Sequence, residues 1–454
     1  MALGRLSCSN RIRSMLRIIL FGCALLGAAV ILAQHGLARA AEPPALSPAS
    51  RGGDLTLRDV IGLTLERNPK LAGHRFALAA VAARRDQAAL RPQLEAGIDV
   101  ENVLGTGRLS AFGDTETTLR LGTVLELSDK RARRVGIADG ERDLLAISQN
   151  AERLDILAEV ARKFIALLQA QEGVTISRQD TALAMRARDI VKIRLDAGRA
   201  TTIEQGTAEL AVLRTQRDQQ RAALAVRQAW ASLSAVWGGV ADQTGVAIGR
   251  LLEMAPVGDF ATLSALIDQN PDILRFASER RVYEATLRLA EAARVPDLAV
   301  NGGIRRLQAD RAMAGVLSLS VPLGTESRAR PFEAEARSRM SVVEFEQAAR
   351  RHELLAALFA LHQELVQRRA EFEAITAGAL PMAQAVVKSA EDGFRSGRFS
   401  LLELTAAQQQ AIALQREALD AAAAYHLLFL ELERLTGRAD PESSRNLSSL
   451  ETRP

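Results

Sequence analysis

A mainly α-helical fold that carries two short β-hairpins is predicted by three observations. Apolar residues recur at helical spacing over most of the chain, and aromatic residues make up only 4% of it, which suits long helices packed through Ala and Leu. Two pairs of short segments instead alternate apolar and polar residues. Three landmarks of the first half return in the second, so one plan of helix, β-hairpin, long helix and final helix is used twice.

The first 40 residues have the features of a secretory signal peptide. Four arginines precede an apolar stretch from Ile18 to Ala33. That stretch is shorter than the about 20 residues of a comfortable helical membrane span. The small residues Ala38 and Ala40 flank Arg39 as a signal peptidase requires, so we expect cleavage before Ala41. A retained membrane anchor is the alternative interpretation.

Removal of this segment changes the composition of what remains. The segment contains five arginines and no acid, so the net charge of +4 becomes −1, and no nucleic-acid partner is expected. Both cysteines, Cys8 and Cys23, lie in the segment, which leaves the mature chain without disulfide or thiolate chemistry. Cys23 follows a faint lipoprotein-like sequence, but the apolar run continues past it, so lipidation is not expected.

No catalytic or metal-binding cluster is expected in the mature chain. Its four histidines are scattered along the sequence and lack the spacing of a metal site. No nucleophile stands in a pattern that would supply it with a base. We therefore predict a protein that is not an enzyme and that holds no cofactor.

The duplication rests on an Asn-Pro pair, a Gly-Arg pair and a glycine that ends the last helix of each half. They are Asn68-Pro69 and Asn270-Pro271, Gly198-Arg199 and Gly397-Arg398, and Gly238 and Gly437. Their separations of 202, 199 and 199 residues are nearly equal. We therefore divide the chain into a signal peptide (1–40), a first repeat (41–238), a linker (239–262), a second repeat (263–437) and a C-terminal tail (438–454).

Each repeat is expected to open with one helix, from Leu57 to Leu90 and from Leu263 to Arg294, that a following proline ends. A long helix from about residue 130 to 196 would reach close to about 100 Å at about 1.5 Å per residue. Seven residues form a coiled-coil seam along it: Ile147, Ala151, Leu154, Ala158, Ala161, Ile165 and Leu168. A second apolar face (Leu157, Val160, Phe164 and Leu167) predicts a helix that needs neighbours on two sides, in a wall or barrel of helices.

Four segments, near residues 94–101, 118–127, 298–304 and 317–323, have the alternation of strands with one apolar and one polar face. Strands of about ten residues can cross a bilayer when tilted. Glu95, Asp99 and Glu101 share the polar face of the first segment, so we expect them to line a barrel lumen. Four strands cannot close a barrel. Either the hairpins form a small periplasmic sheet, or several chains contribute strands, and three chains would give twelve.

The chain resembles the TolC-like outer-membrane efflux proteins. The resemblance is carried by the duplicated plan, by the Asn-Pro of each opening helix and by residues 394–408, FRSGRFSLLELTAAQ. Residues 125–134, LELSDKRARR, are similar to the strand-to-helix junction of the CzcC-like subunits of heavy-metal efflux pumps. Apart from Phe112, the hairpins contain no aromatic residues, which departs from the family pattern.

This resemblance implies a homotrimer in the outer membrane, with a twelve-stranded β-barrel on a long α-helical barrel that extends into the periplasm. The implied partners are outer-membrane lipid, a periplasmic adaptor protein and an inner-membrane, proton-driven RND pump. The implied function is export of small solutes, with metal cations favoured over drugs. The alternative function is a periplasmic coiled-coil scaffold or adaptor with a small β domain.

Gly198 and Gly397 are expected to form turns between long helices, since glycine adopts a left-handed turn at little cost. The resemblance implies that these turns are the periplasmic tips. It also implies that the residues beside them dock the adaptor: Arg199, Thr201, Arg398 and Ser400.

Glu204 and Glu403 each follow their tip glycine by six residues. The resemblance implies that a residue matching Glu403 lines the closed periplasmic entrance. Three copies of each glutamate would ring a narrow pore, and rings of carboxylates favour cations. The alternative for each is an exposed glutamate at a helix start, stabilised by the helix dipole.

Overall fold

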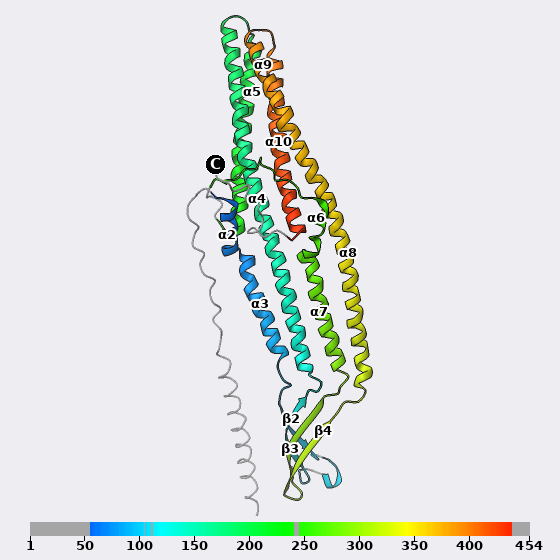
Figure 1. Cartoon of the computed structure of the whole chain (residues 1–454). Helices are drawn as coiled ribbons and strands as arrows, with labels where there is room; N and C mark the ends of the chain where they lie inside the picture. Colours follow the sequence, from blue (N-terminus) through cyan, green and yellow to red (C-terminus); the bar gives the residue numbers. More distant parts are fainter. Residues whose placement is uncertain (1–54, 104, 110–111, 240–244, 438–454) are drawn as a thin grey trace, which may run out of the picture. The chain divides into compact units, whose positions relative to one another are not determined.

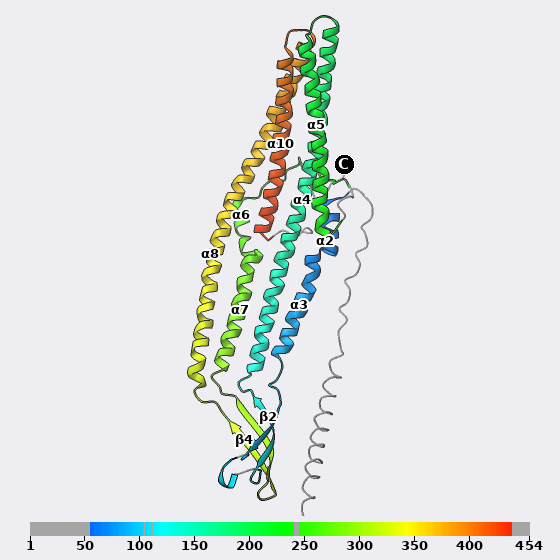
Figure 2. The same cartoon turned by 180° about the vertical axis from the view of Figure 1, so that it is seen from behind.

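The computed structural model describes residues 55–103, 105–109, 112–239 and 245–437. The helices of these residues gather in a bundle, and a four-stranded sheet lies at one end of it (Figures 1 and 2). The expected signal peptide, the cysteines within it and the C-terminal tail lie outside the described residues.

Two similar series of elements follow one another. The first consists of α2 (Leu57–Arg67), α3 (Pro69–Ala88), β1 (Glu95–Glu101), β2 (Glu116–Leu125), α4 (Lys130–Asp196) and α5 (Thr202–Ser234). The second consists of α6 (Phe260–Ser264), α7 (Pro271–Ala292), β3 (Leu298–Leu307), β4 (Ala312–Ser320), α8 (Thr325–Ala374), α9 (Leu380–Arg395) and α10 (Leu401–Leu435). A π-helical turn, Ile375–Ala379, separates α8 from α9.

The expectation of one continuous opening helix is wrong, because Asn68 interrupts it. Asn68 has an extended backbone, and its Oδ1 accepts hydrogen bonds from the backbone N–H of Lys70 (2.9 Å) and Leu71 (3.3 Å). Pro69 then occupies the first position of α3, where its missing N–H costs nothing. The second series repeats the break, since Asn270 caps α7 in the same way.

The side-chain nitrogen of each asparagine reaches the end of a second helical segment. Asn68 Nδ2 donates to the carbonyl of Val236 (2.8 Å), and Asn270 Nδ2 donates to the carbonyl of Leu435 (2.9 Å). The two asparagines are only 7% and 1% exposed. Each therefore satisfies the N–H groups that begin one helix and a carbonyl group that ends another, both of which lack partners within their own helices.

The long helix α4 is continuous over 67 residues and lies at the centre of the bundle. Both of its predicted apolar faces pack against other helices. All four residues of the second face, Leu157, Val160, Phe164 and Leu167, are buried in one core cluster with residues of α2 and α10 and with Trp230 of α5. The neighbours of this face thus come from helices of the same chain.

The sheet joins the two series. Its strand order is β1-β2-β3-β4, and every neighbouring pair is antiparallel. β2 and β3 pair over ten residues, from Glu116 opposite Leu307 to Leu125 opposite Leu298. One long edge of β1 and one of β4 therefore remain without a strand partner among the residues that the structure describes.

None of the helices that the structure describes combines the length and the apolarity required to cross a membrane.

Replacing Asn68 or Asn270 by Ala should lower the free energy of unfolding by about 1–3 kcal/mol, because a buried carbonyl and a helix N-terminus lose their partner together. Asn68→Asp keeps the capping oxygen but sets a buried carboxylate oxygen against the Val236 carbonyl in place of the Nδ2 donor, so it should not restore wild-type stability. Denaturant titration of the purified protein measures the change. Asn150→Ala, at an exposed position of α4, is the matched control. Stability of Asn270→Ala equal to that of this control would contradict the assignment.

Candidate functional site at the helical turns and on the sheet

The turns between the long helices depend on left-handed glycines. Gly198 joins α4 to α5 with a φ of +71°, and Gly397 joins α9 to α10 with a φ of +76°. A Cβ atom at either position would meet nothing within 4 Å. The backbone angle, rather than lack of space, is therefore what requires glycine at both positions.

Both turns lie at the end of the bundle opposite the sheet (Figure 1), and Arg194 connects them. Its guanidinium donates to the carbonyls of Phe394 (2.9 Å) and Arg199 (3.2 Å) and lies 4.4 Å from the centre of the Phe394 ring. A small core beneath the turns includes Val191 and Leu404. Our sequence analysis missed Arg194, although its place in the last turn of α4 is where arginine binds helix-end carbonyls.

Glu204 and Glu403 both belong to capping boxes. Glu204 Oε2 accepts a hydrogen bond from the backbone N–H of Thr201 (2.7 Å), while the backbone N–H of Glu204 donates to Thr201 Oγ1 (3.2 Å). Glu403 and Ser400 make the same pair of bonds at 2.7 and 3.3 Å. Each glutamate thus stabilises the start of its own helix through one carboxylate oxygen.

The other carboxylate oxygen of each glutamate accepts no hydrogen bond from any residue that the structure describes. Glu403 is exposed, and the backbone N–H of Ser400, followed by its hydroxyl, lowers the pKa of the Glu403 carboxyl. Glu403 is therefore anionic at neutral pH and well below it. The capping role leaves this negative charge available at the surface.

The arginines beside the turns do not neutralise these glutamates. Arg398 donates to Ser396 Oγ (3.1 Å), and Arg199 contributes its carbonyl to Arg194. Within the described ranges, neither Arg199 nor Arg398 forms an ion pair. Both cationic side chains are thus free to meet an acidic partner.

On the sheet, two of the three predicted lumen acids meet arginines on one polar face. Asp99 pairs with Arg120 at 3.0 Å, and Arg305 pairs with both Glu101 (3.0 Å) and Glu116 (2.8 Å). Glu95 is exposed and has no ion-pair partner in the part of the chain that is described. The polar face therefore carries compensated charges apart from Glu95.

The opposite face of the sheet is apolar and uncovered. Six large apolar side chains on this face are each more than half exposed: Ile98, Leu119, Leu121, Ile304, Leu317 and Leu319. A contiguous apolar face of this kind marks contact with a partner or a membrane.

Ion pairs also fix the junction between sheet and helices. Lys130 Nζ donates to Asp297 Oδ1 (2.7 Å) and to the Val295 carbonyl (2.7 Å), which ties the start of α4 to the start of β3. Glu126 and Arg134 form a second pair just beside it. Sequence similarity had singled out residues 125–134, but not the partner Asp297, which lies on the other half of the chain.

No group of three or more His, Cys, Asp or Glu residues in the described part of the chain is placed to hold a metal ion.

The comparisons with known proteins agree with one another. The family model for outer membrane efflux proteins matches residues 60–239. The chain is 26% identical over 371 residues to the cobalt-zinc-cadmium resistance protein CzcC of Cupriavidus metallidurans, which covers 80% of this chain and 85% of the relative. It is 23% identical to the nickel-cobalt-cadmium resistance protein NccC of Alcaligenes xylosoxydans xylosoxydans, over 72% of this chain and 73% of that protein.

Solved structures show the same fold. The outer-membrane channel OprN has a TM-score of 0.70 at 15% identity, over 84% of this chain and 89% of that chain. CusC has a TM-score of 0.68 at 16% identity, over 87% and 96%. A membrane protein from Pseudomonas aeruginosa has a TM-score of 0.68 at 19% identity, over 87% and 98%.

The predicted fold class, mainly α-helical with a small β part of the TolC-like kind, is thus confirmed, as is the predicted outer-membrane location. The family match, the two relatives and the fold together indicate an outer membrane efflux protein of the CzcC-like branch, located in the outer membrane.

Proposed function

We propose that this protein is the outer-membrane channel subunit of a tripartite RND-type efflux system that exports heavy-metal cations. The observation that carries the proposal is the two-faced sheet, polar and ion-paired on one side and apolar and uncovered on the other. The cargo is supported by the names of both relatives, which concern resistance to cobalt, zinc, cadmium and nickel. A periplasmic adaptor and an inner-membrane RND pump are the partners that the family implies.

The functional unit in this proposal is a homotrimer with a twelve-stranded β-barrel. Each chain offers four strands with two unpaired edges, and open edges are not tolerated in lipid. Exposed apolar side chains on the bundle support neighbouring chains there as well. They include Ile203 and Leu210 on α5 and Met382 and Val386 on α9. Each chain of the trimer would consist of two repeats, 41–238 and 263–437, with the linker 239–262 between them.

The periplasmic entrance is proposed to lie at the helical turns, with Glu204 and Glu403 supplying its negative charge. Adaptor docking is assigned to the same end. Because Thr201 and Ser400 use their hydroxyls to cap α5 and α10, the arginines beside them are the side chains that remain available to an adaptor. In the barrel, Glu95 is the proposed lumen acid whose charge is not offset by an arginine among the described residues.

The purified protein should be a detergent-stable homotrimer, and it should fractionate with outer membranes. The exposed apolar face of the sheet requires a lipid or detergent cover, and the unpaired edges require neighbouring chains. Native mass measurement and membrane fractionation test both points. Recovery of most of the folded protein as a monomer in a detergent-free periplasmic extract would contradict the channel and favour a periplasmic scaffold.

The double variant Glu204→Gln, Glu403→Gln should reduce the cation preference of bilayer conductance and leave stability nearly unchanged, because glutamine can still complete a capping box. Alanine at both positions should also lower stability, since the box is lost. Because hydrogen bonds from Ser400 lower the pKa of Glu403, its contribution to cation preference should persist to a lower pH than that of an unperturbed glutamate.

The matched control for this pair is Glu209→Gln, Glu417→Gln, which removes two exposed charges farther along the same helices. Both pairs are compared at low salt, where screening is weakest. Wild-type selectivity in the Glu204 and Glu403 pair would show that these residues only cap their helices.

A further inference from the structure

The apolar face of the sheet carries one charged side chain, Arg306, at the end of the face farthest from the helices (Figure 1). Arg306 of β3 lies opposite Thr117 of β2 and Met313 of β4. The strand residues described on this face include no aspartate and no glutamate. Arg306 therefore borders an otherwise uncharged surface, and no acid of that surface can neutralise it.

Arg306 is exposed and forms no ion pair or hydrogen bond with any residue that the structure describes. Its neighbour Arg305 lies on the opposite face, where it is paired with Glu101 and Glu116. Strand alternation thus separates two consecutive arginines. One of them is compensated within the chain, and the other is not.

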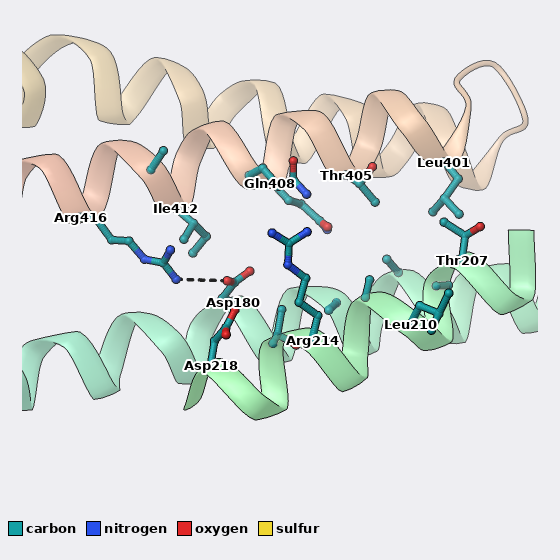
Figure 3. A pocket seen from close by; sticks show the side chains of 17 residues that line it. Asp180, Thr207, Leu210, Arg214, Asp218, Leu401, Thr405, Gln408, Ile412 and Arg416 are labelled. Carbon is teal, nitrogen blue, oxygen red and sulfur yellow. Dashed lines mark hydrogen bonds and ion pairs between the residues drawn. The ribbon is translucent and has the colours of Figure 1, made fainter. Parts of the chain in front are cut away.

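By contrast, the charges that line a groove of the helical bundle balance one another. In this groove of about 470 Å³ between α4, α5 and α10, Asp180 pairs with Arg416 at 3.5 Å (Figure 3). Burial raises the pKa of Asp180, and Arg416 and Arg214 both oppose that rise. With Asp218, the groove holds two arginines and two aspartates. It has no charge left for a ligand, whereas Arg306 does.

The place of Arg306 along its strand corresponds to the edge of a membrane. Arg306 follows Leu298, the first residue of β3, by eight positions, which is about 26 Å at about 3.3 Å per residue. A strand tilt of about 35–45° reduces this to about 20 Å across the membrane, close to the height of about 25 Å of the apolar band on outer-membrane barrels. Arg306 therefore falls at the boundary between the acyl chains and the headgroups.

An exposed aromatic side chain marks the same end of the sheet. Phe112, in the connection between β1 and β2, is 64% exposed. The backbone N–H of Gln308 donates to the carbonyl of Thr115 at 3.0 Å, so this connection runs beside the turn that follows Arg306. Amphipathic aromatic and cationic side chains both gather where a membrane meets water.

We propose that Arg306 binds the phosphate of a lipid headgroup in the outer leaflet. The methylene groups of its side chain lie along the apolar face while the guanidinium reaches the headgroups, and its planar fork of N–H groups matches two phosphate oxygens. A cation that borders lipid without a partner is costly. The inference rests on the proposed function, because it requires the apolar face to meet lipid and the helices to extend into the periplasm.

The test compares a lipid that carries phosphate with one that lacks it. The detergent-solubilised full-length protein is titrated with phosphatidylglycerol or with diacylglycerol of the same acyl chains, and bound lipid is counted by native mass measurement. The wild type should prefer phosphatidylglycerol. Arg306→Gln should weaken phosphatidylglycerol binding by roughly tenfold, the effect of losing a charged hydrogen bond, and should leave diacylglycerol binding unchanged. Free inorganic phosphate should not displace the lipid.

Arg311→Gln is the matched control, because it removes the same charge from the turn of the same hairpin, beside Asp310 and beyond the apolar face. It should bind phosphatidylglycerol like the wild type. Equal losses in the two variants, unchanged binding by Arg306→Gln, or displacement by inorganic phosphate would overturn the proposal and leave the channel function intact. A wild type that binds neither lipid would contradict both. The same spectra record whether each variant assembles like the wild type.

Discussion

One buried asparagine in each half, Asn68 or Asn270, joins the start of one helix to the end of another segment, and the course of the chain depends on this link. The side-chain oxygen begins α3 or α7, and the nitrogen holds the carbonyl of Val236 or Leu435. The link fixes where the opening helices turn towards the sheet. Because both halves make it in the same way, their hairpins arrive side by side, and β2 can pair with β3 along its whole length.

The sheet brings several acidic side chains together on its polar face. Acids on its polar face would repel one another, and the arginines of β2 and β3 offset most of that charge, with Arg305 bridging Glu101 and Glu116. The other face carries one arginine, Arg306, in the row of Val100 and Met313, is otherwise dominated by apolar side chains, and stays uncovered by the described residues. At the far end of the bundle, glycine turns and capping boxes place Glu204 and Glu403 at helix starts, where the helix dipole also favours their charge.

Local signals were sufficient for much of this arrangement. The Asn-Pro pairs, the Gly-Arg turns and the strand alternation all correspond to elements of the structure, because each depends on residues close in sequence. The break at Asn68 was missed although Asn followed by Pro is a helix-start signal. Contacts between residues far apart, such as Asn68 with Val236 or Arg305 with Glu101, depend on packing and strand register, which no local pattern specifies. Arg306 was missed for a related reason, because it breaks the apolar alternation of its strand, whereas pairing with β2 continues the strand to Leu307.

The central claim is that the apolar face of the sheet meets lipid while the polar face meets an aqueous lumen. Single cysteines at Leu119 and Glu95, in a chain that lacks Cys8 and Cys23, test it most directly through labelling of intact outer membranes with a water-soluble maleimide. The account predicts rapid labelling at position 95 and protection at position 119 that is lost on denaturation. Equal labelling of both positions in the native membrane would contradict it.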